Sequence, residues 1–346
     1  MNILVMGAGT VGSIVGGYLT GSGYNVTLVD GWSANVDVLN REGLKLSGTR
    51  GEHHFHVKAV MMEELSSVKG PFGIIFISVK TYDTALIAEY IRPLLSAETI
   101  IISTQNGINE EFLASEFGRN RVIGAVTEMS GYMLGPGNVV ETRKDGGFVL
   151  GELDGSDTPR LQKVASVMAG CGHIKISNNI MGILWSKLIW NSMMNPLTAI
   201  SGLGTGRILQ HDRYRMLALE VGMEGFAVSN KHHISLEPLT LMGVDPRRLD
   251  ANQPLEVQAQ GTASKLLPEP LDKMPSMAQD IKNGRLTEID YINGILVEWG
   301  KKLEVPTPVN EEIVKTVHAI EEKQKTQSPA LLDAIIEKLG LRRDGK

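Results

Sequence analysis

A lysine and two asparagines at a four-residue spacing are the first residues in this sequence that could take part in chemistry. Lys187, Asn191 and Asn195 lie in the segment WSKLIWNSMMNPLTA, whose other residues are mostly apolar. Residues four apart share one face of a helix, so the segment predicts a polar stripe on a helix that is otherwise packed. The alternative is a solvated helix edge whose amides bond neighbouring loops, because lysine is seldom fully buried.

A glycine-rich turn near the N-terminus has the pattern of a dinucleotide-binding loop. Gly7-Ala8-Gly9-Thr10-Val11-Gly12 follows an apolar strand and opens a helix rich in small residues, and the next strand ends at Asp30. Gly7 allows the tight turn, Gly9 lets backbone approach a pyrophosphate, and Gly12 lets helix and strand pack closely. The helix N-terminus supplies N–H donors to phosphates. This combination predicts a nucleotide site, against the alternative of a glycine-rich turn in an unrelated α/β unit.

Further apolar strands alternate with helical segments through the first half of the chain. The apolar run within GIIFISVKT ends at Lys80, and the one within TIIISTQNG ends at Asn106. Continuous apolar strands of this kind are typical of a parallel sheet that is covered on both faces, and polar groups at the strand ends face the ligand crevice. Lys80 and Asn106 are therefore candidate site residues, unless they are ordinary loop residues.

The second half of the sequence is helical from Ile180 onward. The chain is long enough for two domains with separate cores. We therefore expect an α/β protein in which an N-terminal Rossmann-type doubly wound sheet, residues 1–177, precedes an all-helical C-terminal domain, residues 178–346. Pro196 cannot donate an N–H to the Ser192 carbonyl, which predicts a bend or break near Asn195.

Composition and charge exclude several classes of protein. A net charge of −5 gives no broad basic field for nucleic acid or an anionic membrane. The single cysteine, Cys171, forms no intrachain disulfide, and no Cys/His grouping has zinc spacing. His54 and His56 fit the exposed face of a strand better than a metal site. No signal region and no apolar run of about 20 residues is present, so we expect a cytoplasmic protein without a bound metal, with a homodimer left open.

The order of the motifs resembles that of the ketopantoate reductase family (2-dehydropantoate 2-reductase), from Met1 to about Glu322. GAGTVG, SVKTYD, TQNG, the WSKLIWNSMMNPLTA segment, SMAQDIKNGRLTEIDYINGILVEWG and VPTPVN recur in that order. The resemblance implies reduction of a 2-oxo acid by nicotinamide hydride. It also implies roles for individual residues. These are Lys187 as general acid, Asn191, Asn195 and Ser276 as substrate contacts, Glu288 as a further active-site residue, and Asn106 between cofactor and substrate.

The role of Glu288 has several possible interpretations. Its carboxylate could hold the lysine electrostatically, or bond a substrate hydroxyl or a cofactor ribose. It could equally be half of a helical surface pair with Lys282 or Arg285.

Two departures from the family pattern bear on the substrate. Thr205 stands where many members have a third substrate asparagine, and the stretch between Asn230 and Ser276 is longer than in compact members. Ketopantoate is the leading substrate, and another branched or bulky 2-oxo acid, reduced or formed by oxidation of its 2-hydroxy acid, is the alternative. A nucleotide-sensing protein that has lost the chemistry is a third interpretation.

The cofactor is either NADH or NADPH. Many family members use NADPH and carry a basic or small polar group after the second strand. Here Asp30 stands at the strand tip, and no arginine or lysine occurs before Arg41. A carboxylate accepts hydrogen bonds from a ribose 2′-hydroxyl but repels a 2′-phosphate, which favours NADH. The alternative is that Asp30 caps the following turn and points away from the ribose.

Overall fold

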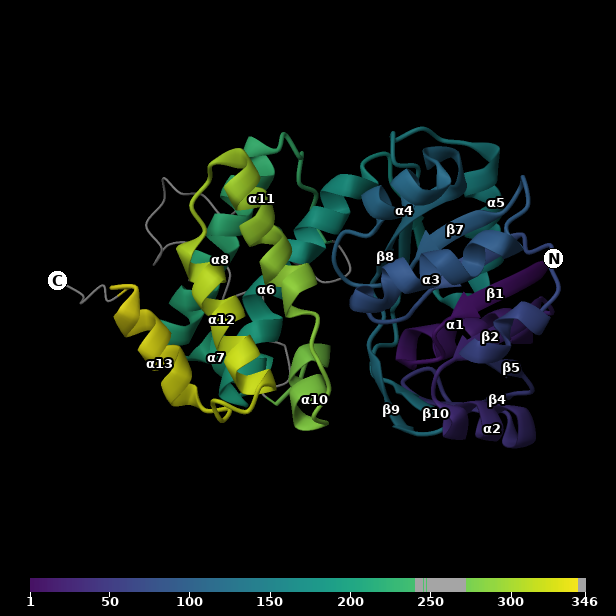
Figure 1. Ribbon diagram of the computed structural model, residues 1–346, viewed down its shortest axis with the longest axis horizontal. Coiled ribbons are helices and arrows are strands. Elements are labelled where there is room, and N and C mark those ends of the chain that lie inside the picture. Colours follow the sequence, from purple (N-terminus) through teal and green to yellow (C-terminus); the bar gives the residue numbers. More distant parts are fainter. Residues whose placement is uncertain (240–244, 246, 248–271, 342–346) are drawn as a thin grey trace. The chain divides into compact units, whose positions relative to one another are not determined.

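The computed structural model describes residues 1–239, 245, 247 and 272–341, and forms two compact units, Met1–Met181 and Gly182–Lys346 (Figure 1). The division falls within the first turn of helix α6 (Ile180–Ser201), close to the boundary expected at Asn178. Most of the long stretch between Asn230 and Ser276 lies outside the described residues.

An eight-stranded sheet forms the centre of the first unit. Its order is β12-β11-β8-β7-β6-β1-β2-β5. The strands are β1 (Asn2–Met6), β2 (Asn25–Asp30), β5 (Lys58–Met61), β6 (Ile74–Ile77), β7 (Ile100–Ser103), β8 (Val122–Thr127), β11 (Gly147–Gly151) and β12 (His173–Ile176). Neighbouring strands are parallel except β8 and β11, which pair antiparallel. The order reverses beside β1, as expected for a doubly wound sheet, and ligands of such sheets bind at this point.

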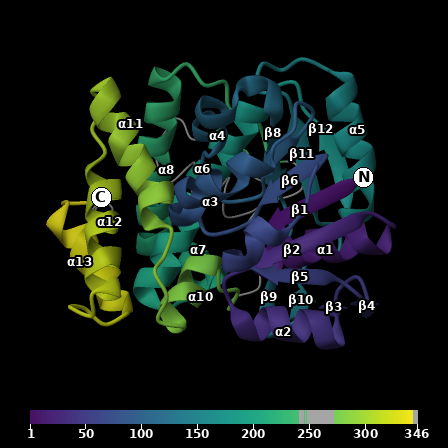
Figure 2. The same ribbon diagram turned by 45° about the vertical axis from the view of Figure 1, so that its right-hand side comes forward.

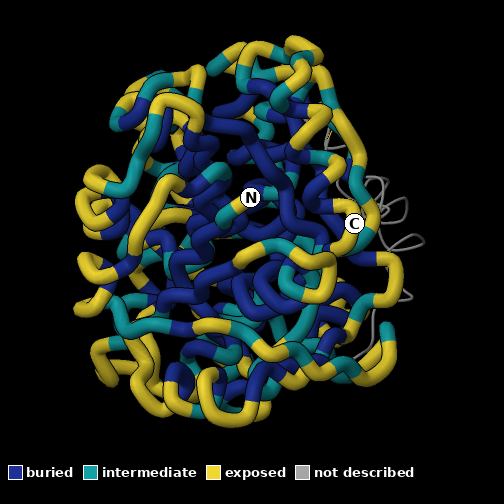
Figure 3. The backbone as a smooth tube through the Cα atoms, turned by 90° about the vertical axis from the view of Figure 1, so that its right-hand side faces the viewer, coloured by how far each residue is buried: buried dark blue, intermediate teal, exposed yellow. Residues whose placement is uncertain are grey.

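Helices cover both faces of this sheet. Helices α1 (Thr10–Gly21) and α5 (Pro159–Met168) pack on one face, and α3 (Thr84–Ile91) and α4 (Glu110–Phe117) pack on the other (Figure 2). Side chains of a strand alternate between faces, so Ile3 and Val5 enter the α1 layer while Leu4 and Met6 enter the α3 layer. The backbone becomes buried within a few residues of the N-terminus (Figure 3). This arrangement confirms the expected Rossmann-type fold.

A second sheet of four short strands packs against α1, and α2 (Ser33–Glu42) packs against β2 and β5 of the large sheet. The order of the second sheet is β4-β3-β10-β9. The strands are β3 (Leu44–Gly48), β4 (His53–Phe55), β9 (Gly131–Gly135) and β10 (Asn138–Glu141). The turn between β9 and β10 lies in the glycine-rich stretch GYMLGPGNV. His54 and His56 are exposed, as the alternating pattern predicted.

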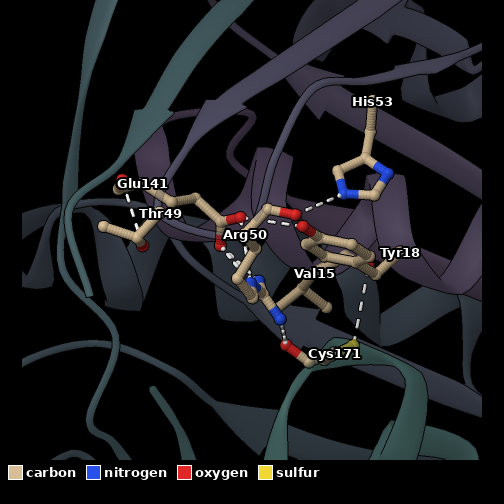
Figure 4. A network of polar contacts seen from close by, with 7 residues as sticks. All are labelled: Val15, Tyr18, Thr49, Arg50, His53, Glu141 and Cys171. Carbon is tan, nitrogen blue, oxygen red and sulfur yellow. Dashed lines mark hydrogen bonds and ion pairs between the residues drawn. The ribbon is translucent and has the colours of Figure 1, made fainter. Parts of the chain in front are cut away.

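A polar network ties this small sheet to α1 (Figure 4). The guanidinium of Arg50 forms an ion pair with the buried carboxylate of Glu141, stacks 4.0 Å from the centre of the Tyr18 ring, and donates to the Cys171 carbonyl. The Tyr18 hydroxyl donates to Glu141 Oε2 at 2.8 Å. Burial raises the pKa of the Cys171 thiol to about 12, so this cysteine is a protonated packing residue at neutral pH.

Short helical turns complete the first unit: η1 (Met62–Ser67), η2 (Thr81–Asp83), η3 (Arg92–Leu94), η4 (Arg119–Arg121) and η5 (Ala169–Cys171). The second unit is built from helices packed around α6. They are α7 (Thr205–Gln210), α8 (Asp212–Lys231), α10 (Ser276–Lys282), the π-helical turn η7 (Asp290–Gly294), α11 (Ile295–Leu303), α12 (Pro308–Glu321) and α13 (Pro329–Lys338). Pro196 lies inside α6, which continues to Ser201, so the helix is not broken there.

Candidate active site

The glycine-rich loop joins β1 to α1 with the geometry that a pyrophosphate requires. Gly7 has a φ of +97°, and a Cβ there would lie 2.8 Å from the Val79 nitrogen. A Cβ on Gly12 would lie 1.9 Å from the Gly7 carbonyl oxygen, whereas one on Gly9 would meet no atom within 4 Å. The open side of the loop at Gly9 therefore leaves room for a ligand beside the N-terminus of α1, where N–H groups favour an anion. These residues fit a dinucleotide.

Asp30 ends β2 beside this loop. Its Oδ1 accepts a hydrogen bond from the Trp32 amide at 3.1 Å, which is the contact of the turn-capping alternative. Its Oδ2 accepts from Asn35 Nδ2 at 2.9 Å. The same Asn35 amide donates to the Ala8 carbonyl within the glycine-rich loop. The tip of β2 and the loop are thus held together by one buried side chain, which the sequence did not single out.

The loops after β6 and β7 lie side by side at the carboxyl edge of the sheet. Thr81 Oγ1 donates to the Asn106 carbonyl at 3.0 Å, and Gln105 Nε2 donates to the Val79 carbonyl at 2.9 Å. Lys80 is the residue before η2 and is half-buried, as is Asn106. The structure therefore brings the segments of Lys80 and Asn106 together at this edge of the sheet.

The polar stripe in the second unit lies on a helix that is buried on nearly every side. Trp185, Leu188 and Ile189 are at most 1% exposed, and Asn191 and Asn195 are 8% and 6% exposed. Lys187 is half-buried. This burial does not fit a solvated helix edge, because buried amides require specific partners.

Pro196 deprives one carbonyl of α6 of its usual donor. The Asn293 side chain replaces that donor, since its Nδ2 lies 3.1 Å from the Ser192 carbonyl oxygen. Asn293 Nδ2 also donates to Asn310 Oδ1, and Asn310 Nδ2 donates to Glu224 Oε2 at 2.7 Å. Burial raises the pKa of the Glu224 carboxyl, while its hydrogen bonds with Asn310 and Val309 oppose that shift. This chain of amides connects α6 to η7, α12 and α8.

Ser276 and Thr205 come from segments that are bonded to each other. Ser276 is the first residue of α10 and is half-buried. Thr205, at 4% exposure, donates its backbone N–H to the Lys273 carbonyl at 3.0 Å, and its hydroxyl reaches the same oxygen at 3.3 Å. The residue in the place of the family's third asparagine therefore anchors the segment that leads into Ser276.

Glu288 is buried, at 5% exposure, directly before the helical segment that contains η7. This burial does not fit a solvated surface position, and Arg285 forms an ion pair with Asp280. The preceding residue is fixed by a carboxylate of α12, because the Thr287 amide donates to Glu321 Oε1 at 2.7 Å. Glu321 and Asp290 both bond the ring of His318.

The candidate cofactor residues belong to the first unit, and the lysine–asparagine stripe, Ser276 and Glu288 belong to the second. In the described part of the chain, no three acidic, histidine or cysteine side chains are grouped as metal ligands. Among the same residues, no helix is both long and apolar enough to cross a membrane. A dinucleotide loop on a Rossmann-type sheet, followed by a helical unit, defines a class of nicotinamide-dependent oxidoreductases.

Comparison with known proteins places the chain within this class. Residues 3–155 match the family model "Ketopantoate reductase PanE/ApbA", and residues 179–321 match the model of its C-terminal domain. The 2-dehydropantoate 2-reductase of Lactococcus lactis subsp. lactis is 30% identical over 335 residues, which cover 94% of this chain and 100% of that protein. The chain belongs to the ketopantoate reductase family.

Other relatives extend this comparison. The 2-dehydropantoate 2-reductase of Pyrococcus horikoshii is 29% identical over 90% of this chain and 94% of its own length. A solved ternary structure of D-mandelate dehydrogenase with NADH and anilino(oxo)acetate superposes with a TM-score of 0.79, at 27% identity, over 93% of this chain and 99% of that one. The similarity therefore spans both units.

Proposed function

We propose that the protein reduces 2-dehydropantoate to pantoate, a step of pantothenate biosynthesis, with Lys187 as the general acid. The observation that carries the proposal is the stripe of one lysine and two asparagines on the buried helix α6. Its support is the similarity of the whole chain to 2-dehydropantoate 2-reductases. Asn191, Asn195 and Ser276 bind the substrate in this proposal, and Asn106 contacts both substrate and cofactor.

The proposed chemistry follows from where charge develops. The bound reduced nicotinamide supplies the hydride. As the carbonyl carbon is reduced, negative charge grows on its oxygen, and an ammonium that can also give up a proton stabilises this transition state more than the ground state. Amides orient the substrate without adding further charges to a site of low polarity. Glu288 is assigned to holding the lysine or a substrate hydroxyl, and its burial supports this assignment.

For the cofactor, we propose that the glycine-rich loop from Gly7 to Gly12 holds the pyrophosphate, that Lys80 contacts the dinucleotide, and that Asp30 bonds the ribose. Asp30 favours NADH over NADPH, because a carboxylate and a 2′-phosphate repel each other at close range. We expect kcat/KM to favour NADH roughly tenfold or more, and Asp30→Ala to narrow that difference. Equal or better efficiency with NADPH in the unmodified protein would show that Asp30 does not bond the ribose.

Initial rates on a panel of 2-oxo acids, each measured with NADH and with NADPH, test the substrate. The expected result is the highest kcat/KM with 2-dehydropantoate. A higher value with another branched or bulky 2-oxo acid would favour the second candidate, a reductase or dehydrogenase of that acid. Thr205 in place of an asparagine and the similarity to a D-mandelate dehydrogenase support this second candidate. No oxidation of either cofactor with any acid would instead indicate a nucleotide-sensing protein.

A further inference from the structure

Asn35 is a buried amide whose hydrogen bonds connect two parts of the proposed cofactor site, Asp30 and the glycine-rich loop, to the turn between β9 and β10. It is 0% exposed. Its Nδ2 donates to Asp30 Oδ2 at 2.9 Å and to the Ala8 carbonyl at 3.2 Å. Its Oδ1 accepts from the Gly137 amide, in the turn between β9 and β10, at 2.8 Å. Both donors and the acceptor are therefore used, and the amide has one orientation that satisfies all of them.

The bond to Asp30 leaves the carboxylate with capacity for a ligand. A carboxylate has about four acceptor positions, two on each oxygen. The Trp32 amide uses one position on Oδ1, and Asn35 uses one on Oδ2. One position on each oxygen is left, which matches the two hydroxyl donors of a ribose. Asp30 is half-buried, so its remaining positions are accessible.

We infer that Asn35 is a positioning residue for cofactor discrimination: it fixes the Asp30 carboxylate relative to the glycine-rich loop and so determines the preference for NADH over NADPH. The inference rests on the proposed role of Asp30. Without Asn35, the Trp32 amide is the one remaining donor to the carboxylate among the residues that the structure describes. A single bond to Oδ1 lets Oδ2 turn away from the ribose and toward solvent, where it neither bonds a 2′-hydroxyl nor repels a 2′-phosphate at close range. The loop also loses the bond to Ala8 that sets its distance from the tip of β2.

Titration of the protein with NADH and with NADPH, followed by dinucleotide fluorescence without substrate, tests this inference. The variants are Asn35→Ala, Asp30→Ala and the double variant. We expect the preference of roughly tenfold for NADH to fall to about threefold or less in Asn35→Ala. Because Asn35 acts through Asp30, the double variant should show the same ratio of NADH to NADPH affinity as Asp30→Ala alone.

A matched control lies one turn further along α2. Asn40 donates to the Ala59 carbonyl at 2.8 Å and accepts from the Ala59 amide at 2.9 Å, so it joins α2 to β5 without touching Asp30. Asn40→Ala should weaken the binding of both dinucleotides equally or not at all. If Asn35→Ala fails to fold, Asn35→Ser replaces it, since one hydroxyl donor cannot serve both Asp30 and Ala8.

The possible outcomes are distinguishable. A preference for NADH that survives in Asn35→Ala or Asn35→Ser overturns the inference and leaves the role of Asp30 intact. Equal affinity of the unmodified protein for both dinucleotides overturns the role of Asp30 and the inference together. The assignment of the 2-oxo acid is untouched by either result, because no substrate is present.

Discussion

Lys187 differs from the exposed lysines of the chain in its surroundings. It is half-buried on a helix whose neighbouring side chains are almost fully buried, whereas Lys315 on α12 is 68% exposed. Removing an ammonium from water costs free energy that a surface lysine does not pay, so its retention on such a helix calls for a role. In the proposed mechanism that role is donation of a proton to the developing alkoxide of the substrate.

We expect Lys187→Ala to lower kcat on the order of 10²-fold or more while dinucleotide binding persists, because the charge acts only on the developing alkoxide. Steady-state kinetics together with fluorescence titration of the cofactor measures both quantities. Lys315→Ala serves as the control and should retain full kcat. A Lys187→Ala enzyme with nearly unchanged kcat would mean that another group supplies the proton.

The sequence predicts residues more reliably than it predicts their partners. Asp30 could be identified because it ends the strand that follows a dinucleotide-type glycine loop, where an acidic residue bonds the ribose. Asn35 could not, since its three partners come from the β2 tip, the glycine-rich loop and a turn about a hundred residues away. An asparagine early in a helix carries no signal that distinguishes these contacts from solvent.

At the scale of elements, α6 shows how a proline can be accommodated in a buried helix. The sequence predicted a bend or break at Pro196, and the break does not occur, because that prediction counted only the lost N–H. It could not include Asn293, which is distant in sequence and supplies a replacement donor to the Ser192 carbonyl. The helix continues to Ser201, and Asn191 and Asn195 remain on one face of it.

We predict that Asn293→Leu leaves the Ser192 carbonyl and Asn310 Oδ1 without this donor and lowers the free energy of unfolding by about 2 kcal/mol. Urea denaturation measures the change. Asn230→Leu, at an exposed position of α8, is the matched control and should change stability by no more than about 0.5 kcal/mol. Equal changes in the free energy of unfolding for the two substitutions would show that the Asn293 bond does not compensate for the N–H that Pro196 lacks.

His318 on α12 makes the stability of the second unit depend on pH. Burial lowers the pKa of His318, but hydrogen bonds from its ring to Glu321 and Asp290 outweigh burial and raise the pKa overall. A raised pKa means that the folded state binds the proton more tightly. The contribution to stability is therefore complete below the unfolded value of about 6.5 and is lost as pH rises through the folded value.

Thermal unfolding of the unmodified protein and of His318→Gln across neutral and mildly alkaline pH tests this point. We expect the melting temperature of the unmodified protein to fall more steeply with rising pH than that of the variant. Glu321 also holds the Thr287 amide next to Glu288, so the same interaction supports the proposed active-site segment. If the melting temperatures of the two proteins changed equally with pH, His318 would not contribute to the pH dependence of stability.

At the scale of the molecule, the two compact units have separate polar networks. Tyr18, Arg50 and Glu141 connect α1 to the small sheet within Met1–Met181. Glu224, Asn293 and Asn310 connect the helices within Gly182–Lys346. In the sequence, the alternation of strands and helices followed by helices alone predicted a Rossmann-type unit followed by a helical unit. The networks themselves depend on contacts between distant residues and could not be predicted.

Because domains open and fold as units, damage to one network should remain in its own unit. Glu141→Gln leaves the Arg50 guanidinium, which is only 16% exposed, without its ionic partner and should destabilise the first unit by about 3 kcal/mol. Hydrogen exchange followed by mass spectrometry should then show faster exchange in peptides from 1–181 and unchanged exchange in peptides from 182–239 and 272–341. Asn293→Leu should give the converse pattern. Equally accelerated exchange in both sets of peptides, for either variant, would show that the units unfold as one cooperative body.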